Sequence, residues 1–336
     1  MGLAAALRRR TITPGFLLPG RRWHEAIARM TAPIDAVLTA FMRSFEPKPP
    51  IFILGPQRSG TPIFYKCFLG HHQVCAMDQA VEHFPESFIT ISLWLRLIGA
   101  DSATDFLEPY DLKKDRWIRT WKNHGYSYTE GNRVWNRMGA LGHWESTEAR
   151  AWAHRVLPRL VRRLTHFTGK PVFLNKCPGN SMRIDQLLEL FPEARFVYIE
   201  RDPRGVINSI VNIHRALGVK AWGPMPIPEC ELEGLSEYAA VAQQWVAITQ
   251  AVERALSSVP EDRKLVVRYE HFMAAPDAAL NEVVVTFGLE PFRQPVSARI
   301  RAERASGWRK EIPAAEQQSI RRIIEEAGLG HTLTEA

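Results

Sequence analysis

Long apolar runs are missing from this sequence of 336 residues. No stretch approaches the roughly 18 consecutive apolar residues that a helix needs to cross a bilayer. The opening residues 1–10 are too short in their apolar part for a secretory signal, so we expect a cytoplasmic chain. Internal repeats and low-complexity segments are also missing, and 46% hydrophobic residues suffice for one large core.

Cysteine is scarce, and its spacing predicts neither a zinc site nor a disulfide framework. None of the four cysteines forms a CxxC pair, and we expect buried thiols at Cys67, Cys75, Cys177 and Cys230. No metal site is predicted. A GxSxG nucleophile elbow is missing too, which removes the main support for a serine hydrolase.

The net charge of +7 is concentrated in two segments. Residues 1–30 hold six arginines against the single Glu25, and residues 299–310 form a second basic cluster. Such clusters attract phosphates of a nucleotide, a nucleic acid or an anionic membrane, although a solvated face is the alternative. We expect residues 1–48 to form a basic, partly helical N-terminal extension, with a helix from Trp23 to Phe45, and residues 49–336 to form one domain.

Short apolar runs alternate with helical patterns along this domain. Strands are predicted at residues 51–54, 172–174, 196–199 and 265–267, and helical periodicity follows at 63–69, 184–191, 206–211, 235–256 and 312–327. This alternation predicts an α/β fold of the P-loop type, with a parallel sheet flanked by helices on both faces. Residues 90–165 show no firm period, and we expect them to be mainly helical and to face the substrate.

The first strand runs into a glycine-bounded loop, GPQRSGTP at residues 55–62. Gly55 and Gly60 permit dihedrals that let backbone N–H groups converge, and a following helix dipole favours a phosphate-type anion. A structural turn is the alternative. Thr61 and Pro62 stand where the Walker pattern has lysine and a magnesium-binding hydroxyl, so a magnesium-dependent NTPase is not predicted.

Two further strand ends deliver cations to the same predicted sheet edge. Lys176 follows the second strand, at the edge where open parallel sheets bind ligands, or is an ordinary surface lysine. Arg201 follows the third strand, with Ser209 on the helix that Pro203 begins. An arginine fork beside a hydroxyl suits a second phosphate, whereas an Arg201–Asp202 pair at the helix start is the alternative.

In this order the segments resemble the sulfotransferase family that uses 3′-phosphoadenosine 5′-phosphosulfate (PAPS), in its tyrosylprotein-type and bacterial branch. Residues 55–61 resemble the family's 5′-phosphosulfate loop, and Arg201 with Ser209 resembles its 3′-phosphate motif. Recognisable motifs cover residues 51–83, 172–215 and 264–289, with a weak match at 308–310. Gln57 and Pro62 depart from the family pattern.

The resemblance implies a PAPS-dependent enzyme that releases adenosine 3′,5′-bisphosphate and needs no metal. It implies cofactor contacts from Gln57, Arg58, Ser59, Gly60, Thr61, Pro62, Arg201, Ser209, Tyr269, Arg309 and Lys310. Lys176 and Arg58 would be the catalytic cations at the leaving group. For the general base we rank Glu82 first and Asp78 second, followed by Glu86, His83 and His143.

The acceptor is a hydroxyl or amine on a small molecule, a glycan or a lipid, and no nucleic acid is expected. The Arg-rich N-terminus would contact an anionic membrane peripherally, or be a solvated face. Two other interpretations stay open: a nucleotide-binding P-loop protein or kinase-like enzyme, and a sulfotransferase relative without activity.

Overall fold

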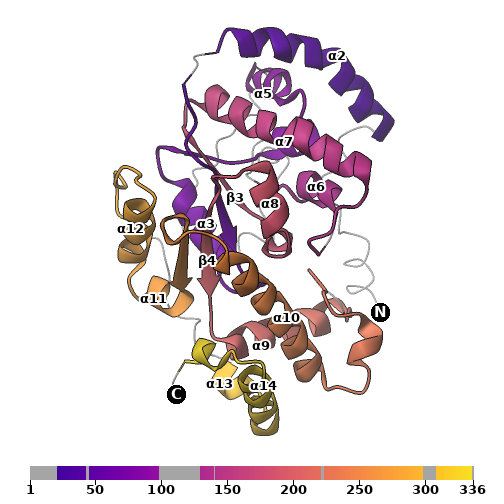
Figure 1. Cartoon of the computed structure of the whole chain (residues 1–336), viewed down its shortest axis with the longest axis vertical. Helices are drawn as coiled ribbons and strands as arrows, with labels where there is room; N and C mark the ends of the chain where they lie inside the picture. Colours follow the sequence, from indigo (N-terminus) through magenta and orange to yellow (C-terminus); the bar gives the residue numbers. More distant parts are fainter. Residues whose placement is uncertain are drawn as a thin grey trace.

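The computed structural model describes residues 21–42, 45–97, 129–139, 141–220, 223–297 and 308–334 (Figure 1). Three predictions fall wholly or partly outside these ranges. They concern the leader up to residue 20, the segment 98–128 within the predicted substrate-facing region, and the arginines of the second basic cluster before residue 308.

The centre of the fold is a five-stranded parallel sheet in the order β2-β3-β1-β4-β5. Its strands are β1 (Ile51–Leu54), β2 (Val74–Cys75), β3 (Val172–Lys176), β4 (Arg195–Glu200) and β5 (Lys264–Arg268). The four strands predicted from apolar runs are confirmed. Strand β2 was not predicted because two residues are too few to show a pattern.

Successive residues of β1 point to opposite faces of the sheet, as the strand pleat requires. Phe52 and Leu54 join one core with residues of the helices α7 (Thr147–Thr168), α8 (Ile184–Leu190) and α10 (Glu237–Ser257). Ile51 and Ile53 join a second core, which holds residues of α3 (Thr61–Leu69), α11 (Tyr269–Ala274) and α12 (Pro276–Thr286). The predicted α/β fold, a parallel sheet with helices on both faces, is confirmed.

A third, smaller core joins α10 to α9 (Pro203–Leu217), α13 (Trp308–Glu311) and α14 (Ala314–Glu326), at the lower end of the molecule in Figure 1. The upper end holds α2 (Arg21–Ala40), α5 (Phe88–Leu97) and α7. The short helices α4 (Gln79–His83) and α6 (Asn132–Trp135) complete the set used below. Across the described residues, no helix combines the length and the apolar character needed to span a bilayer.

Candidate active site

The loop between β1 and α3 has a conformation that depends on glycine. Gly60 has a φ of +95°, and a side chain there would overlap the ring of Tyr269, which follows β5. Arg58 also has a positive φ, +70°, which is uncommon for a residue with a side chain. The loop is therefore held in a tight, specific shape against the first residue of α11.

The start of α3 suits an anion and tolerates the family departure at Pro62. Proline lies in the first turn, where an N–H has no partner inside the helix, so the replacement costs no helical hydrogen bond. The Ser59 hydroxyl beside it is buried and has no hydrogen-bond partner among the described residues. A bound oxyanion would supply the missing partner.

Arg201, after β4, is the centre of a cationic cluster that joins two predicted sites. Its guanidinium lies 4.5 Å from the centroid of the Tyr269 ring and donates to the carbonyl of Arg58 at 2.9 Å. Arg58 Nε in turn donates to the Ser209 hydroxyl at 2.9 Å. The structure thus brings Arg58, Arg201, Ser209 and Tyr269 together at the carboxyl edge of the sheet.

The charges around this cluster favour an anionic ligand. Burial lowers the pKa of Arg201 from its usual range and the adjacent Arg58 charge lowers it further, while Glu270 and Asp202 act in the opposite direction. The Asp202 carboxylate accepts hydrogen bonds from Arg204, at 2.6 Å, and from Thr334. Arg201 Nε is buried without a partner among the described residues, so a donor remains for a ligand.

Helix α13 lies next to Arg201. A side chain on Gly205 would approach both Trp308, at 3.1 Å, and Arg201, at 3.3 Å, so these two residues flank the first turn of α9. Trp308 is buried beneath the guanidinium of Arg204. The predicted cations Arg309 and Lys310 follow it and are exposed.

Lys176 is buried at the end of β3, and its ammonium forms an ion pair with the carboxylate of Glu130. The Glu130 side chain is 35% exposed, against 4% for Lys176. Asn175 Nδ2 donates to the Glu130 carbonyl at 3.2 Å, which holds that backbone against the strand end. A cation and a carboxylate therefore meet beside the anion loop.

Most of the predicted base candidates form other contacts in the described structure. Asp78 caps α4 by accepting from Val81 N–H, and Glu82 accepts from Arg133 N–H at 2.9 Å. The other three candidates are placed as follows: Glu86 accepts from Trp152, His83 contacts Arg133, and His143 is exposed. None of the five lines the cavities described next.

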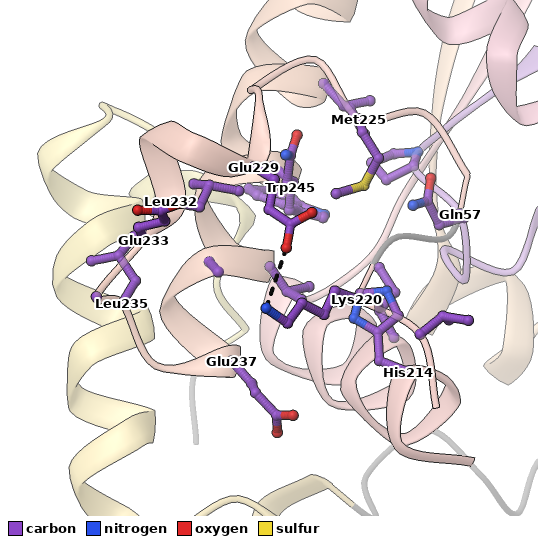
Figure 2. Close-up of a pocket in the computed structure, with 18 residues that line it drawn as sticks. Gln57, His214, Lys220, Met225, Glu229, Leu232, Glu233, Leu235, Glu237 and Trp245 are labelled. Atoms are coloured by element: carbon purple, nitrogen blue, oxygen red, sulfur yellow. Dashed lines mark ion pairs between the residues drawn. The ribbon is translucent and has the colours of Figure 1, made fainter. Parts of the chain in front are cut away.

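Two cavities adjoin the loop and share Gln57 and Met225 in their linings. One, of about 580 Å³, is lined by Glu130, Glu145 and Arg183 among others, and is polar in part. The second, of about 310 Å³, lies between α9 and α10 and is lined mainly by apolar residues, including Trp245. Figure 2 shows Gln57 and Met225 on the same side of the second cavity, and its dashed line marks the ion pair between the lining residues Lys220 and Glu229.

Comparison with known proteins decides the family. The sequence model of the sulfotransferase family matches residues 49–294, more than half of the chain. The chain belongs to the sulfotransferase family. The resemblance deduced from the loop, Lys176 and Arg201 segments is thereby confirmed.

Individual sulfotransferases match only part of the chain. Omega-hydroxy-beta-dihydromenaquinone-9 sulfotransferase Stf3 of Mycobacterium tuberculosis is 30% identical over 138 residues, 41% of this chain. The protein-tyrosine sulfotransferase of Drosophila melanogaster is 24% identical over 119 residues, 35% of this chain. The matches span 34% and 21% of these relatives, so the chain aligns with about a third or less of their length.

Solved sulfotransferases share the fold over more of the chain. The structure of STF1 from Mycobacterium tuberculosis superposes with a TM-score of 0.53 at 13% identity, covering 97% of this chain and 86% of that one. STF9 from Mycobacterium avium gives a TM-score of 0.50 at 14% identity, covering 91% and 81%. At these identities the likeness concerns the fold of the sulfotransferase domain.

Glu130, the ion-pair partner of Lys176, was not singled out from the sequence. It lies about 50 positions after the segment expected to supply the base, yet Thr129 N–H donates to the carbonyl of Met77, so residues 129–131 run beside that segment. The Glu130 carboxylate therefore lies near residues 78–86, where a carboxylate was expected, although it belongs to another part of the chain. The only local signal is a turn-forming Glu130-Gly131-Asn132 sequence, which does not indicate a function.

Proposed function

We propose that the protein transfers a sulfuryl group from PAPS to a hydroxyl group of an apolar acceptor. The observation that supports this most directly is the pairing of two anion sites at one sheet edge. The loop at residues 55–62 and the Arg201–Ser209 pair contact each other through Arg58 and Tyr269. A nucleotide with phosphates on both its 3′ and 5′ positions matches such a pair.

The residues present fit PAPS at both ends. The loop, with the unpartnered Ser59 hydroxyl and the first turn of α3, would hold the 5′-phosphosulfate together with Arg58. Arg201, through its unpartnered Nε, and Ser209 would hold the 3′-phosphate, and Arg309 and Lys310, which follow Trp308 beside Arg201, would close over it. Tyr269 stacks on Arg201 and fixes its direction.

PAPS supplies the sulfuryl group, which moves to the acceptor oxygen as the sulfur–oxygen bond to the bisphosphate breaks. In our proposal Lys176 donates hydrogen bonds to the oxygen that gains negative charge as this bond breaks. Glu130 accepts the proton that the acceptor hydroxyl loses as its oxygen bonds to sulfur. The ion pair between the two side chains holds both of them beside the anion loop, where the transfer would take place.

The two cavities suggest the chemistry of the acceptor. A hydroxyl group in the polar cavity would reach Glu130, and an apolar body could extend past Gln57 and Met225 into the cavity beside Trp245. A cavity of about 310 Å³ is at the lower end of the usual size for small-molecule sites, about 300 Å³ to 1,000 Å³. The name of the Stf3 relative, which describes a hydroxylated menaquinone derivative, supports an acceptor of this type.

The cofactor assignment predicts a selective loss at Arg201. We expect Arg201→Ala to lower the affinity for adenosine 3′,5′-bisphosphate by about 10- to 150-fold. This is the loss that corresponds to a charge-assisted hydrogen bond of about 1.5–3 kcal/mol. Adenosine 5′-phosphate lacks the 3′-phosphate that Arg201 would hold, so the affinity for this ligand should change little. Calorimetric titration of both ligands, without magnesium, measures the difference, and an equal loss for both would refute the 3′-phosphate assignment.

The apolar cavity predicts a dependence on acceptor chain length. Along a series of linear primary alcohols, KM should fall about fourfold for each added methylene until the cavity is filled, since each buried CH₂ contributes about 0.8 kcal/mol. Ala240→Phe, which narrows this cavity, should stop the fall at a shorter chain while leaving bisphosphate affinity unchanged. If KM does not depend on chain length in either protein, the apolar part of the acceptor does not bind in this cavity.

A further inference from the structure

Helix α2 attaches to the protein through a side that carries Asp35 and Thr39 together with Leu38, which packs against the main core. Asp35 is fully buried, and its carboxylate accepts from Ile89 N–H at 3.0 Å, from Thr90, and from Arg163 at 2.6 Å. Arg163 Nε also donates to the Thr39 hydroxyl at 3.1 Å. These contacts fix the rotation of the helix about its axis, with Asp35 turned toward α5 and α7.

The opposite side of α2 is an exposed apolar stripe. Met30, Ile34, Val37 and Phe41 follow one another at spacings of four, three and four residues, so they share one side of the helix and its end. Their exposed fractions are 75%, 50%, 58% and 84%. Trp94, on the helix α5 that packs against α2, is 56% exposed as well.

This orientation of α2 is the reverse of the one that the hydrophobic effect favours for a surface helix. A surface helix normally buries its apolar side and exposes its carboxylates, yet α2 buries Asp35 and exposes four large apolar side chains. Single exposed apolar residues are ordinary, whereas a continuous stripe of them marks a surface that another apolar phase covers. The buried polar contacts hold the stripe outward.

We propose that the stripe of α2, defined by Met30, Ile34, Val37 and Phe41, inserts into the interfacial layer of an anionic lipid membrane. This goes beyond the proposed activity and does not depend on it. An interfacial helix needs an apolar face and nearby basic residues, and it lies in the membrane plane without spanning it. Figure 1 shows α2 at one end of the molecule, with its long axis across that end.

The charge near α2 favours a membrane, and not a second copy of the chain, as the partner that covers the stripe. Residues 1–30 hold six arginines and one glutamate, and Arg21, Arg22 and Arg29 belong to α2 itself. Pairing two α2 stripes would bring two such clusters together, and like charges repel. An anionic membrane surface attracts each of the arginines, with about 1 kcal/mol for each one close to it.

Vesicle sedimentation of the full chain tests the proposal. We expect binding to vesicles of equimolar phosphatidylcholine and phosphatidylglycerol, and much weaker binding to phosphatidylcholine alone. The quadruple variant Met30→Ser, Ile34→Ser, Val37→Ser and Phe41→Ser should lower the partition coefficient by about 100-fold or more, and Phe41→Ser alone by about 10-fold. Replacing Arg21, Arg22 and Arg29 by serine, which removes half of the six arginines, should weaken the preference for the anionic lipid.

The control is a double variant, Leu217→Ser with Val285→Ser, which removes apolar side chains of similar exposure from α9 and α12. It should bind vesicles like the unaltered chain, and all variants should keep the thermal stabilisation given by adenosine 3′,5′-bisphosphate. Equal binding to both vesicle types would overturn the proposal, as would no binding to either. So would a Phe41→Ser variant that loses thermal stability or dissociates a dimer without losing lipid binding.

Discussion

Replacement of Glu130 by glutamine should lower kcat by about 10²- to 10⁴-fold with an aliphatic alcohol as acceptor, because the variant cannot take the proton that the hydroxyl loses. The loss should be smaller with an acidic phenol, which gives up its proton with little help. Glutamine keeps the size of the side chain and its contact with Lys176, so affinity for adenosine 3′,5′-bisphosphate should change little. Steady-state rates with a graded series of phenols and alcohols measure this dependence.

Three matched carboxylates serve as controls for this assignment. Glu145→Gln alters a second glutamate that lines the same polar cavity. In this variant kcat should depend on the acidity of the acceptor as it does in the wild-type protein. Asp78→Asn and Glu82→Gln alter the two carboxylates ranked first from the sequence. If one of these, and not Glu130→Gln, shows the steeper loss with alcohols, the base is that residue.

Lys176→Ala should lower kcat by about 10²- to 10³-fold, the usual effect of removing one donor that stabilises charge in the transition state. This charge develops only as the leaving oxygen separates from sulfur, so KM for PAPS and affinity for the bisphosphate should change modestly. The loss should persist with acidic phenols, since leaving-group charge is the same for every acceptor. Glu130→Gln and Lys176→Ala are thereby distinguished by acceptor acidity.

Lys170→Ala provides a control lysine, since Lys170 precedes the same strand at its opposite end. That variant should keep its kcat. Because Lys176 is buried against Glu130, its removal also leaves a carboxylate without its partner, and the melting temperature must be followed. A Lys176→Ala enzyme with normal kcat and a lowered melting temperature would give this lysine a structural role alone.

Local sequence patterns were enough to predict the sheet and the cations at its edge. Apolar runs of three or four residues identified β1, β3 and β4, because a strand buried on both faces must be apolar throughout. The run at residues 265–267 identified β5 as well, although β5 is an edge strand and Val266 is 51% exposed. Arg58, Lys176 and Arg201 each come at or just beyond the end of such a run. Parallel strands end at one edge, so local pattern alone was enough to bring these three residues to the same region.

Other features required contacts between segments distant in sequence. Glu130 meets Lys176 across 46 positions, and Gly60 is required by the ring of Tyr269, which belongs to another strand end. The periodicity of α2 predicts a helix but cannot say which side faces the protein. That choice depends on Arg163 and on the backbone at Ile89 and Thr90, whose hydrogen bonds to Asp35 exist only after the chain has folded. Local propensity acts over a few residues, and these partners are brought together only by tertiary packing.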